Sequence, residues 1–296
     1  MPQPNFVHLR LHSEYSISDG MVRVGEAVAA AKQDAMPALA LTDLNNYFGL
    51  VKFYKKARDK GVKPVVGCDV YITNDADPER PFRLLLLCQS TEGYRLLCRL
   101  LSRAFLENQH RGRAELRREW LHHENNGLIA LSGAHLGDVG SALLSGNGVQ
   151  AQKFAQEWAA LFNNRYYIEV QRVGHADEEH YIHDAIKLAA ELGLPVVATH
   201  PVQFLSAEDF KAHEARVCIA EGYVLNDKRR IKAFTEQQYF KTQAEMVELF
   251  ADLPEALQNS VEIARRCNLS LVLDKPCLPD FPTPNDETLD EFLRAE

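Results

Sequence analysis

The 296-residue sequence predicts an α/β fold in which parallel strands close into a barrel. Three observations lead to this fold class. Short apolar runs of strand length recur up to about residue 205, stretches with helical spacing separate most of them, and polar residues follow directly after several runs. Such alternation is typical of parallel strands joined by right-handed helical crossovers. Seven or eight such units close most economically into a barrel, although spacing also allows an open doubly wound sheet.

The first strand is expected at residues 6–12 (FVHLRLH), directly before the polar loop 13–20. Because side chains along a strand alternate between its two faces, His8, Arg10 and His12 are expected to share one face. Two imidazoles and a guanidinium at a strand end, followed by carboxylates, indicate a site; a strand whose outer face is simply polar is the alternative. Six further runs are predicted as strands: residues 36–42, 63–72, 83–88, 127–132, 165–171 and 194–199.

Helices are predicted where apolar residues recur three and four positions apart. Residues 107–126 are polar and charged and are expected to form an excursion, and residues 133–137 are expected to be a loop of small residues. The predicted helices are residues 24–32, 50–60, 93–106, 149–162, 178–192, 208–221, 243–250 and 254–267, with a further helix beginning in 287–296.

Two regions are expected along the chain. Residues 1–270 form the barrel domain with its C-terminal helices, and residues 271–296 form an extended linker and the truncated start of a following region. The proline-rich composition of 269–284 predicts extended chain there.

Composition indicates an ordinary globular domain, 46% hydrophobic and 25% charged. A net charge of -8 argues against a surface that mainly binds nucleic acid. Six scattered cysteines without a CxxC pair indicate reduced thiols rather than a disulfide framework or a zinc ribbon. There is no apolar signal region and no apolar run near the roughly 18 residues of a membrane span, so a cytoplasmic protein without a membrane partner is expected.

Carboxylates and imidazoles gather after the predicted strands, which is typical of metal-dependent hydrolases. Two arginines stand among them, and a guanidinium neither deprotonates nor ligates a metal. The strand-end residues are Arg10, His12, Asp19, Asp43, Asp69, Arg83, Ser132, Glu169, Gln171, His200 and Gln203.

Several segments together resemble the PHP (polymerase and histidinol phosphatase) domain at the N-terminus of bacterial DNA polymerase III alpha subunits. They are FVHLRLHSEYSISDG, ALALTDLNNYFGLVKFY, GVKPVVGCDVYI, GLIALSG, GLPVVATHPVQFL and ELFADLPEALQNSVEIARRCNL. The resemblance covers nearly the whole chain in consistent order. It implies a distorted seven-stranded (β/α)7 TIM-like barrel with a C-terminal helical extension. In metal-binding members, side chains at nine strand-end positions hold up to three divalent ions for phosphoester hydrolysis.

The resemblance assigns those nine positions to residues of this chain. Three of them, His12, Asp19 and Asp69, still carry side chains that can ligate a metal. The other six positions have lost their ligands. The second motif, for example, reads Thr42-Asp43-Leu44-Asn45 where the family has TDHG, so Leu44 stands in place of the ligating histidine. The six are Arg10, Leu44, Arg83, Ala134, Pro201 and Gln203.

Two interpretations of this pocket remain. Neighbouring polar residues could supply a displaced single-ion site together with the three retained ligands; the candidates are His8, Asp43, His135 and His200. The favoured interpretation is a vestigial pocket without metal. There, Arg10 is expected to bridge Asp19 or Asp69, with Arg83 near by, because a guanidinium supplies the missing positive charge and donates paired hydrogen bonds.

The resemblance implies three classes of function. The favoured one is a non-catalytic PHP domain that supports the polymerase module of the same parent chain and docks the proofreading exonuclease subunit. The second is a residual metal-dependent 3′–5′ exonuclease or phosphoesterase, with zinc or manganese. The third, a nucleic-acid-binding module, is disfavoured by the net charge of -8, so DNA is expected to be contacted only through the parent protein. The parent is expected to be a magnesium-dependent DNA-directed DNA polymerase.

Overall fold

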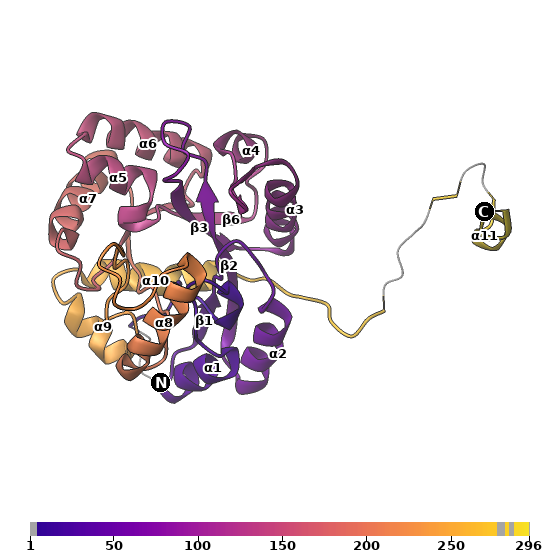
Figure 1. Cartoon of the computed structure of the whole chain (residues 1–296), viewed down its shortest axis with the longest axis horizontal. Helices are drawn as coiled ribbons and strands as arrows, with labels where there is room; N and C mark the ends of the chain where they lie inside the picture. Colours follow the sequence, from indigo (N-terminus) through magenta and orange to yellow (C-terminus); the bar gives the residue numbers. More distant parts are fainter. Residues whose placement is uncertain (1–4, 277–281, 284–286, 296) are drawn as a thin grey trace.

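The computed structural model describes residues 5–276, 282–283 and 287–295 (Figure 1). A curved sheet lies at its centre, with helices around it (Figure 1). Six strands form this sheet in the order β1-β2-β3-β6-β7-β8. Their bounds are β1 Ala38–Leu41, β2 Lys63–Ile72, β3 Phe82–Cys88, β6 Leu128–Leu131, β7 Tyr166–Val170 and β8 Val196–Ala198.

The two faces of the sheet are covered by different layers. Alternate strand residues such as Leu39 and Leu86 join the main core, which the outer helices complete. On the other face, Leu85 and Ile129 join a second cluster that includes Ile263 of α10 (Pro254–Arg266). Both faces are therefore apolar at this level, which explains why the strand sequences read as continuous apolar runs.

Two strand pairings correct the expected parallel arrangement. β3 runs antiparallel to both of its neighbours, β2 and β6, whereas β1–β2, β6–β7 and β7–β8 are parallel. The physical reason is the connection between β2 and β3, residues 73–81, which contains no helix. A parallel crossover needs a dozen or more residues, while an antiparallel return needs only a short loop.

The expected first strand is also corrected, because residues 6–12 form no regular strand. This segment lies between β1 and the chain after β8: His8 O accepts from Ala40 N at 2.9 Å, and His12 N donates to Val202 O at 3.0 Å. A side chain takes the place of a backbone acceptor in this segment: Leu11 N donates to Thr42 Oγ1 at 2.9 Å. The sheet is thus curled and six-stranded, and a closed seven-stranded barrel is not confirmed.

The helices largely follow the predicted periodicity. Two of them, at 50–60 and 178–192, have the predicted bounds, and each ends at a glycine with positive φ, Gly61 at 71° and Gly193 at 65°. The helices not yet given bounds are α1 Val24–Gln33, α2 Leu50–Lys60, α3 Thr91–Glu107, α6 Gly148–Leu161, α7 Glu178–Leu192, α8 Phe210–Glu221, α9 Gln243–Leu249 and α11 Leu289–Ala295.

Two stretches contain more structure than expected. The excursion 107–126 holds the hairpin β4 Gln109–His110 and β5 Arg113–Ala114, followed by α4 Arg118–His123. The small-residue loop contains a 3₁₀ turn, Ala134–Leu136, and leads into the unpredicted α5 Asp138–Leu144.

Part of the expected linker, residues 277–281, 284–286 and 296, lies outside the described residues. Among the residues that are described, no helix has the length and apolar character needed to cross a membrane.

Candidate functional site: a cavity lined by ion pairs

A cavity of about 630 Å³ opens at the end of the sheet where β2 and β7 finish and the antiparallel β3 begins. Its lining includes all nine positions that the family pattern assigns to metal ligands: Arg10, His12, Asp19, Leu44, Asp69, Arg83, Ala134, Pro201 and Gln203. The structure therefore brings the retained and the lost positions together in one place.

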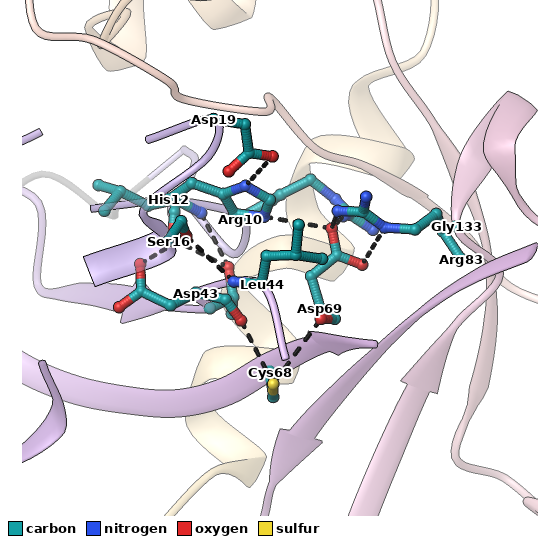
Figure 2. Close-up of polar contacts among 12 residues, drawn as sticks. Arg10, His12, Ser16, Asp19, Asp43, Leu44, Cys68, Asp69, Arg83 and Gly133 are labelled. Atoms are coloured by element: carbon teal, nitrogen blue, oxygen red, sulfur yellow. Dashed lines mark hydrogen bonds and ion pairs between the residues drawn. The ribbon is translucent and has the colours of Figure 1, made fainter. Parts of the chain in front are cut away.

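Asp69, fully buried on β2 three residues before the strand ends, is the centre of this site. Arg10 donates from Nη1 to Asp69 Oδ2, and Arg83 donates from Nη2 to the same oxygen and from Nε to Oδ1, the latter at 3.3 Å (Figure 2). Both arginines are nearly buried, with side-chain exposures of 6% and 13%. Two guanidinium groups thus cover the oxygens of the carboxylate that a metal ion would need.

The prediction that Arg10 would contact Asp19 or Asp69, with Arg83 near by, is confirmed at Asp69. The partner of Asp19 is His12, whose Nδ1 lies 3.0 Å from Asp19 Oδ2, while His12 Nε2 lies 3.2 Å from Asp69 Oδ2 (Figure 2). Burial lowers the pKa of His12, but the two carboxylates outweigh it and raise that pKa to about 9. At neutral pH the imidazole is therefore a cation that donates from both nitrogens.

Each charge in the cluster is stabilised by its neighbours. Burial raises the pKa of Asp69, yet Arg10, Arg83 and His12 together hold it well below its ordinary value. Burial likewise raises the pKa of Asp19, and His12 more than offsets this, so that the pKa is lowered. For Arg10 and Arg83, burial lowers the pKa and the carboxylates raise it above the ordinary value. All of these groups are ionised at neutral pH.

Glu169 on β7 is a member that the sequence interpretation did not pair with anything. Arg10 donates to both of its oxygens, Nε to Oε1 and Nη2 to Oε2, each at 2.9 Å. Glu169 also accepts from Gly133 N at 3.0 Å, from Gln171 Nε2 at 3.0 Å and from the hydroxyl of Thr199. The available signal was a single carboxylate inside an otherwise apolar strand, YYIEV.

The four neighbours proposed as substitute ligands are not gathered at the cavity, although the rings of His8 and His200 lie 5.9 Å apart, centroid to centroid. His8 and His200 do not line the cavity; their Nε2 atoms bond the carbonyls of Lys241 at 2.8 Å and Tyr239 at 2.9 Å. Asp43 accepts from Ser13 N at 2.6 Å and from the hydroxyl of Ser16 at 2.9 Å. These three residues therefore serve as backbone anchors.

His135 is the one neighbour among the four that lines the cavity. Its ring lies 5.2 Å from that of His175, centroid to centroid. Burial is the main cause that lowers the pKa of His135 to about 4, and His175 and Arg10 lower it further. The imidazole is therefore neutral at physiological pH. His135 directly follows Ala134 in the chain, and Ala134 occupies the position where the family pattern expects a ligand.

The donor set does not fit the metal cluster of the family. In the part of the chain that the structure describes, no group of three or more His, Cys, Asp or Glu side chains is arranged to hold a metal ion. The oxygens of Asp69 are engaged by arginines, and Leu44, Ala134 and Pro201 offer no side-chain donor.

The sequence is similar to curated proteins named DNA polymerase III subunit alpha. It is 48% identical to the one from Pseudomonas fluorescens over 291 residues, 51% to the one from Neisseria meningitidis serogroup B over 296 residues, and 43% to the one from Escherichia coli K12 over 294 residues. These matches cover 98–99% of this chain and 25–26% of each relative. The chain thus spans about a quarter of the length of these relatives.

Among solved structures, an amidohydrolase from Chromobacterium violaceum, with bound sulfate and no metal, superposes with a TM-score of 0.50. The identity is 15%, and the match covers 71% of this chain and 96% of that one, so this likeness concerns the fold alone. The profile described as the PHP domain matches residues 8–173, which is more than half of the sequence. On this match, and with the nine family positions gathered around one cavity, the chain belongs to the PHP domain family.

Proposed function

We propose that this chain is a non-catalytic PHP domain of a DNA polymerase III alpha subunit. The parent protein would be a DNA-directed DNA polymerase that acts in chromosome replication in the cytoplasm and uses magnesium in its polymerase module. The relatives named above support this context, since they match almost the entire chain at 43–51% identity. Because the chain spans about a quarter of their length, the polymerase activity belongs to the proposal for the parent.

The pairing of Asp69 with both Arg10 and Arg83 is the observation that carries the non-catalytic assignment. Two unit charges about 4 Å apart interact by about 4 kcal/mol at an effective dielectric constant of about 20, and a dication doubles this. Two guanidinium groups on the same carboxylate therefore oppose a divalent ion there by several kcal/mol. They also make it unnecessary, because they neutralise the clustered carboxylates. The cavity is accordingly proposed to be a degenerate metal site.

A structural role follows from the segments that the ion pairs connect. Arg10 lies on the N-terminal segment, Asp69 on β2, Arg83 on β3 and Glu169 on β7. The cluster joins four segments at the cavity, which is where metal ions would join them in metal-binding members. We propose that the rigid domain built in this way supports the polymerase module of the same parent chain and docks the proofreading exonuclease subunit.

Metal analysis and hydrolysis assays test the non-catalytic assignment. Protein purified without chelators is expected to contain no stoichiometric zinc, manganese or magnesium, and to hydrolyse neither single-stranded DNA nor a phosphate monoester when these ions are added. Chelator-sensitive hydrolysis that disappears in the double variant His12→Ala, Asp19→Ala would contradict the proposal.

That outcome would instead support a second function, a residual metal-dependent 3′–5′ exonuclease or phosphoesterase using zinc or manganese. One observation favours it: the retained ligand His12 still lies beside the other two, 3.0 Å from Asp19 Oδ2 and 3.2 Å from Asp69 Oδ2. A single ion could bind only if Arg10 and Arg83 left Asp69.

The docking role is tested by titrating the chain with a purified proofreading exonuclease subunit and, separately, with single-stranded DNA at physiological salt. Binding to the subunit is expected from the proposed docking role. Little affinity for DNA is expected because the net charge of the chain is -8. Tight, strongly salt-dependent DNA binding without subunit binding would count against it.

A further inference from the structure

Large apolar side chains are exposed on α8 and on the loop that follows it. Ile219 is 82% exposed, Val224 70% and Ile231 83%, although each is aliphatic. Exposed apolar side chains that occur singly are ordinary, but a contiguous group of them indicates an interaction surface. We call this group the α8 patch; it consists of Ile17, Ile219, Tyr223, Val224, Leu225 and Ile231.

Two arginines join the segments that carry the patch residues. Arg230 donates from Nη2 to Glu214 Oε2 of α8 at 2.8 Å and from Nη1 to the carbonyl of Leu225 at 3.2 Å, which folds the loop back onto the helix. Arg216, one helical turn before Ile219, donates from Nε to the carbonyl of Ile17 at 2.8 Å. The loop after His12 is therefore attached to the same helix.

The backbone of Ile17 is strained in a way that places its side chain in solvent. Its φ is 59°, a value that is strongly unfavourable for a β-branched residue, and its side chain is 64% exposed. Such strain costs on the order of a few RT, persists only where surrounding contacts enforce it, and concentrates at functional positions. Arg216 provides the enforcing contact at the Ile17 carbonyl.

The loop after α8, residues 222–232, is basic, with Lys228, Arg229, Arg230 and Lys232 against Asp227, in contrast to the chain as a whole with its net charge of -8; Glu221 at the end of α8 is the exposed acid beside it. Arg229 and Arg230 are paired with Asp227 and Glu214. Lys228 and Lys232 are exposed and have no ion pair among the described residues, so they leave positive charge at the surface; Lys232 also lines the cavity and thus lies between it and the patch. Exposed charges are screened beyond about 8 Å at physiological ionic strength. A partner segment lying on the patch would therefore interact electrostatically mainly with these two nearby lysines.

We propose that the α8 patch docks an acidic amphipathic segment of a partner protein, with its apolar side chains on Ile219 and Val224 and its carboxylates near Lys228 and Lys232. The inference rests on the proposed docking role of the domain and names the surface and the chemistry of the partner. Nucleic acid is the less suitable occupant, because bases stack on aromatic side chains and Tyr223 is the sole aromatic member of the patch.

The test measures binding of the whole chain to a fluorescent synthetic peptide with leucine at helical three- and four-residue spacing and glutamate elsewhere. Two paired variants test the proposal: Ile219→Ser with Val224→Ser removes two members of the patch, and Lys228→Glu with Lys232→Glu reverses the charge beside it. Matched controls alter equally exposed residues on other helices: Leu106→Ser with Val149→Ser, at 85% and 82% exposure, and Lys153→Glu with Lys187→Glu. Thermal melting is expected to be unchanged in all of them.

Each patch pair is expected to weaken peptide binding about tenfold or more, because apolar contacts at the centre of a small interface carry most of its affinity. The control pairs are expected to change it less than about twofold. Equal binding by parent and patch variants would overturn the proposal, as would patch-dependent binding of single-stranded DNA or phosphatidylserine vesicles in place of the peptide.

The purified exonuclease subunit, titrated against the same variants, separates this inference from the proposed function. If the subunit binds parent and patch variants alike, the surface assignment fails and the docking role stands. If the subunit binds nothing while the peptide requires an intact patch, the exonuclease role fails and the docking surface stands.

Discussion

Arg10 donates two parallel hydrogen bonds to Glu169, from Nε to Oε1 and from Nη2 to Oε2, each at 2.9 Å. The two residues are 159 positions apart in the sequence, and their pairing fastens the N-terminal segment to β7. The third nitrogen of Arg10 reaches Asp69, so one side chain satisfies two buried carboxylates. This arrangement makes Arg10 the first position at which to test the role of the cluster.

Replacing Arg10 by alanine is expected to lower the free energy of unfolding by roughly 3–5 kcal/mol, because Glu169 and part of Asp69 are left buried without their counter-charge. Chemical denaturation followed by circular dichroism measures this. The control is Arg99→Ala, whose ion pair with Glu124 is exposed, at 63% and 61%, and whose loss is expected to cost less than about 1 kcal/mol. Similar stabilities of the two variants would show that the cluster is not a stabilising centre.

A metal response is expected to return when guanidinium groups are replaced by imidazoles. The triple variant Arg10→His, Leu44→His, Arg83→His frees the oxygens of Asp69 and adds ligands beside it, since Leu44 forms a β-bridge with Asp69. Zinc or manganese at about 100 times its Kd would stabilise this variant by about 2.7 kcal/mol, a rise in Tm of a few degrees. Adding His12→Ala should abolish the response. An equal metal response in the parent would contradict the expectation.

The stability of the parent is expected to fall as pH rises from about 6.5 to 9. The pKa of His12 is about 9 in the folded chain and about 6.5 in the unfolded chain, so its stabilisation is complete below 6.5 and is lost as pH passes the folded value. The difference corresponds to roughly 3 kcal/mol. His12→Gln should remove this decline, as measured by denaturation at a series of pH values. Parallel curves for parent and variant would refute the assignment of the decline to His12.

A second decline is expected on the acid side. Burial lowers the pKa of His8 to about 4 and that of His200 still further, so both stay neutral in the folded chain. Their contribution is present above the unfolded pKa of about 6.5 and is lost as pH falls from 6.5 toward 4, because a proton on Nδ1 would find no partner. His8→Gln should reduce the slope of unfolding free energy against pH in this range. An unchanged slope would mean that other groups dominate acid unfolding.

Local patterns in the sequence were sufficient for most elements. The bounds of α2 and α7 were predicted from apolar spacing and a terminal glycine, and those of β2 from a run of apolar and β-branched residues. The motif positions were also sufficient to predict that Arg10, His12 and Asp69 would meet at one cavity, which the structure confirms. These features depend on residues close together in the chain, or on a pattern shared by a whole family.

Other features depended on tertiary structure. The partner of Arg10 at Glu169, the antiparallel direction of β3 and the use of His8 as an anchor for residue 241 each join segments distant in the sequence. Periodicity specifies which face of an element is apolar, but it contains no information on which distant side chain occupies the facing position. The sequence left open whether the retained carboxylates face a metal or an arginine, and only the folded positions of Arg10 and Arg83 show two fixed positive charges on Asp69.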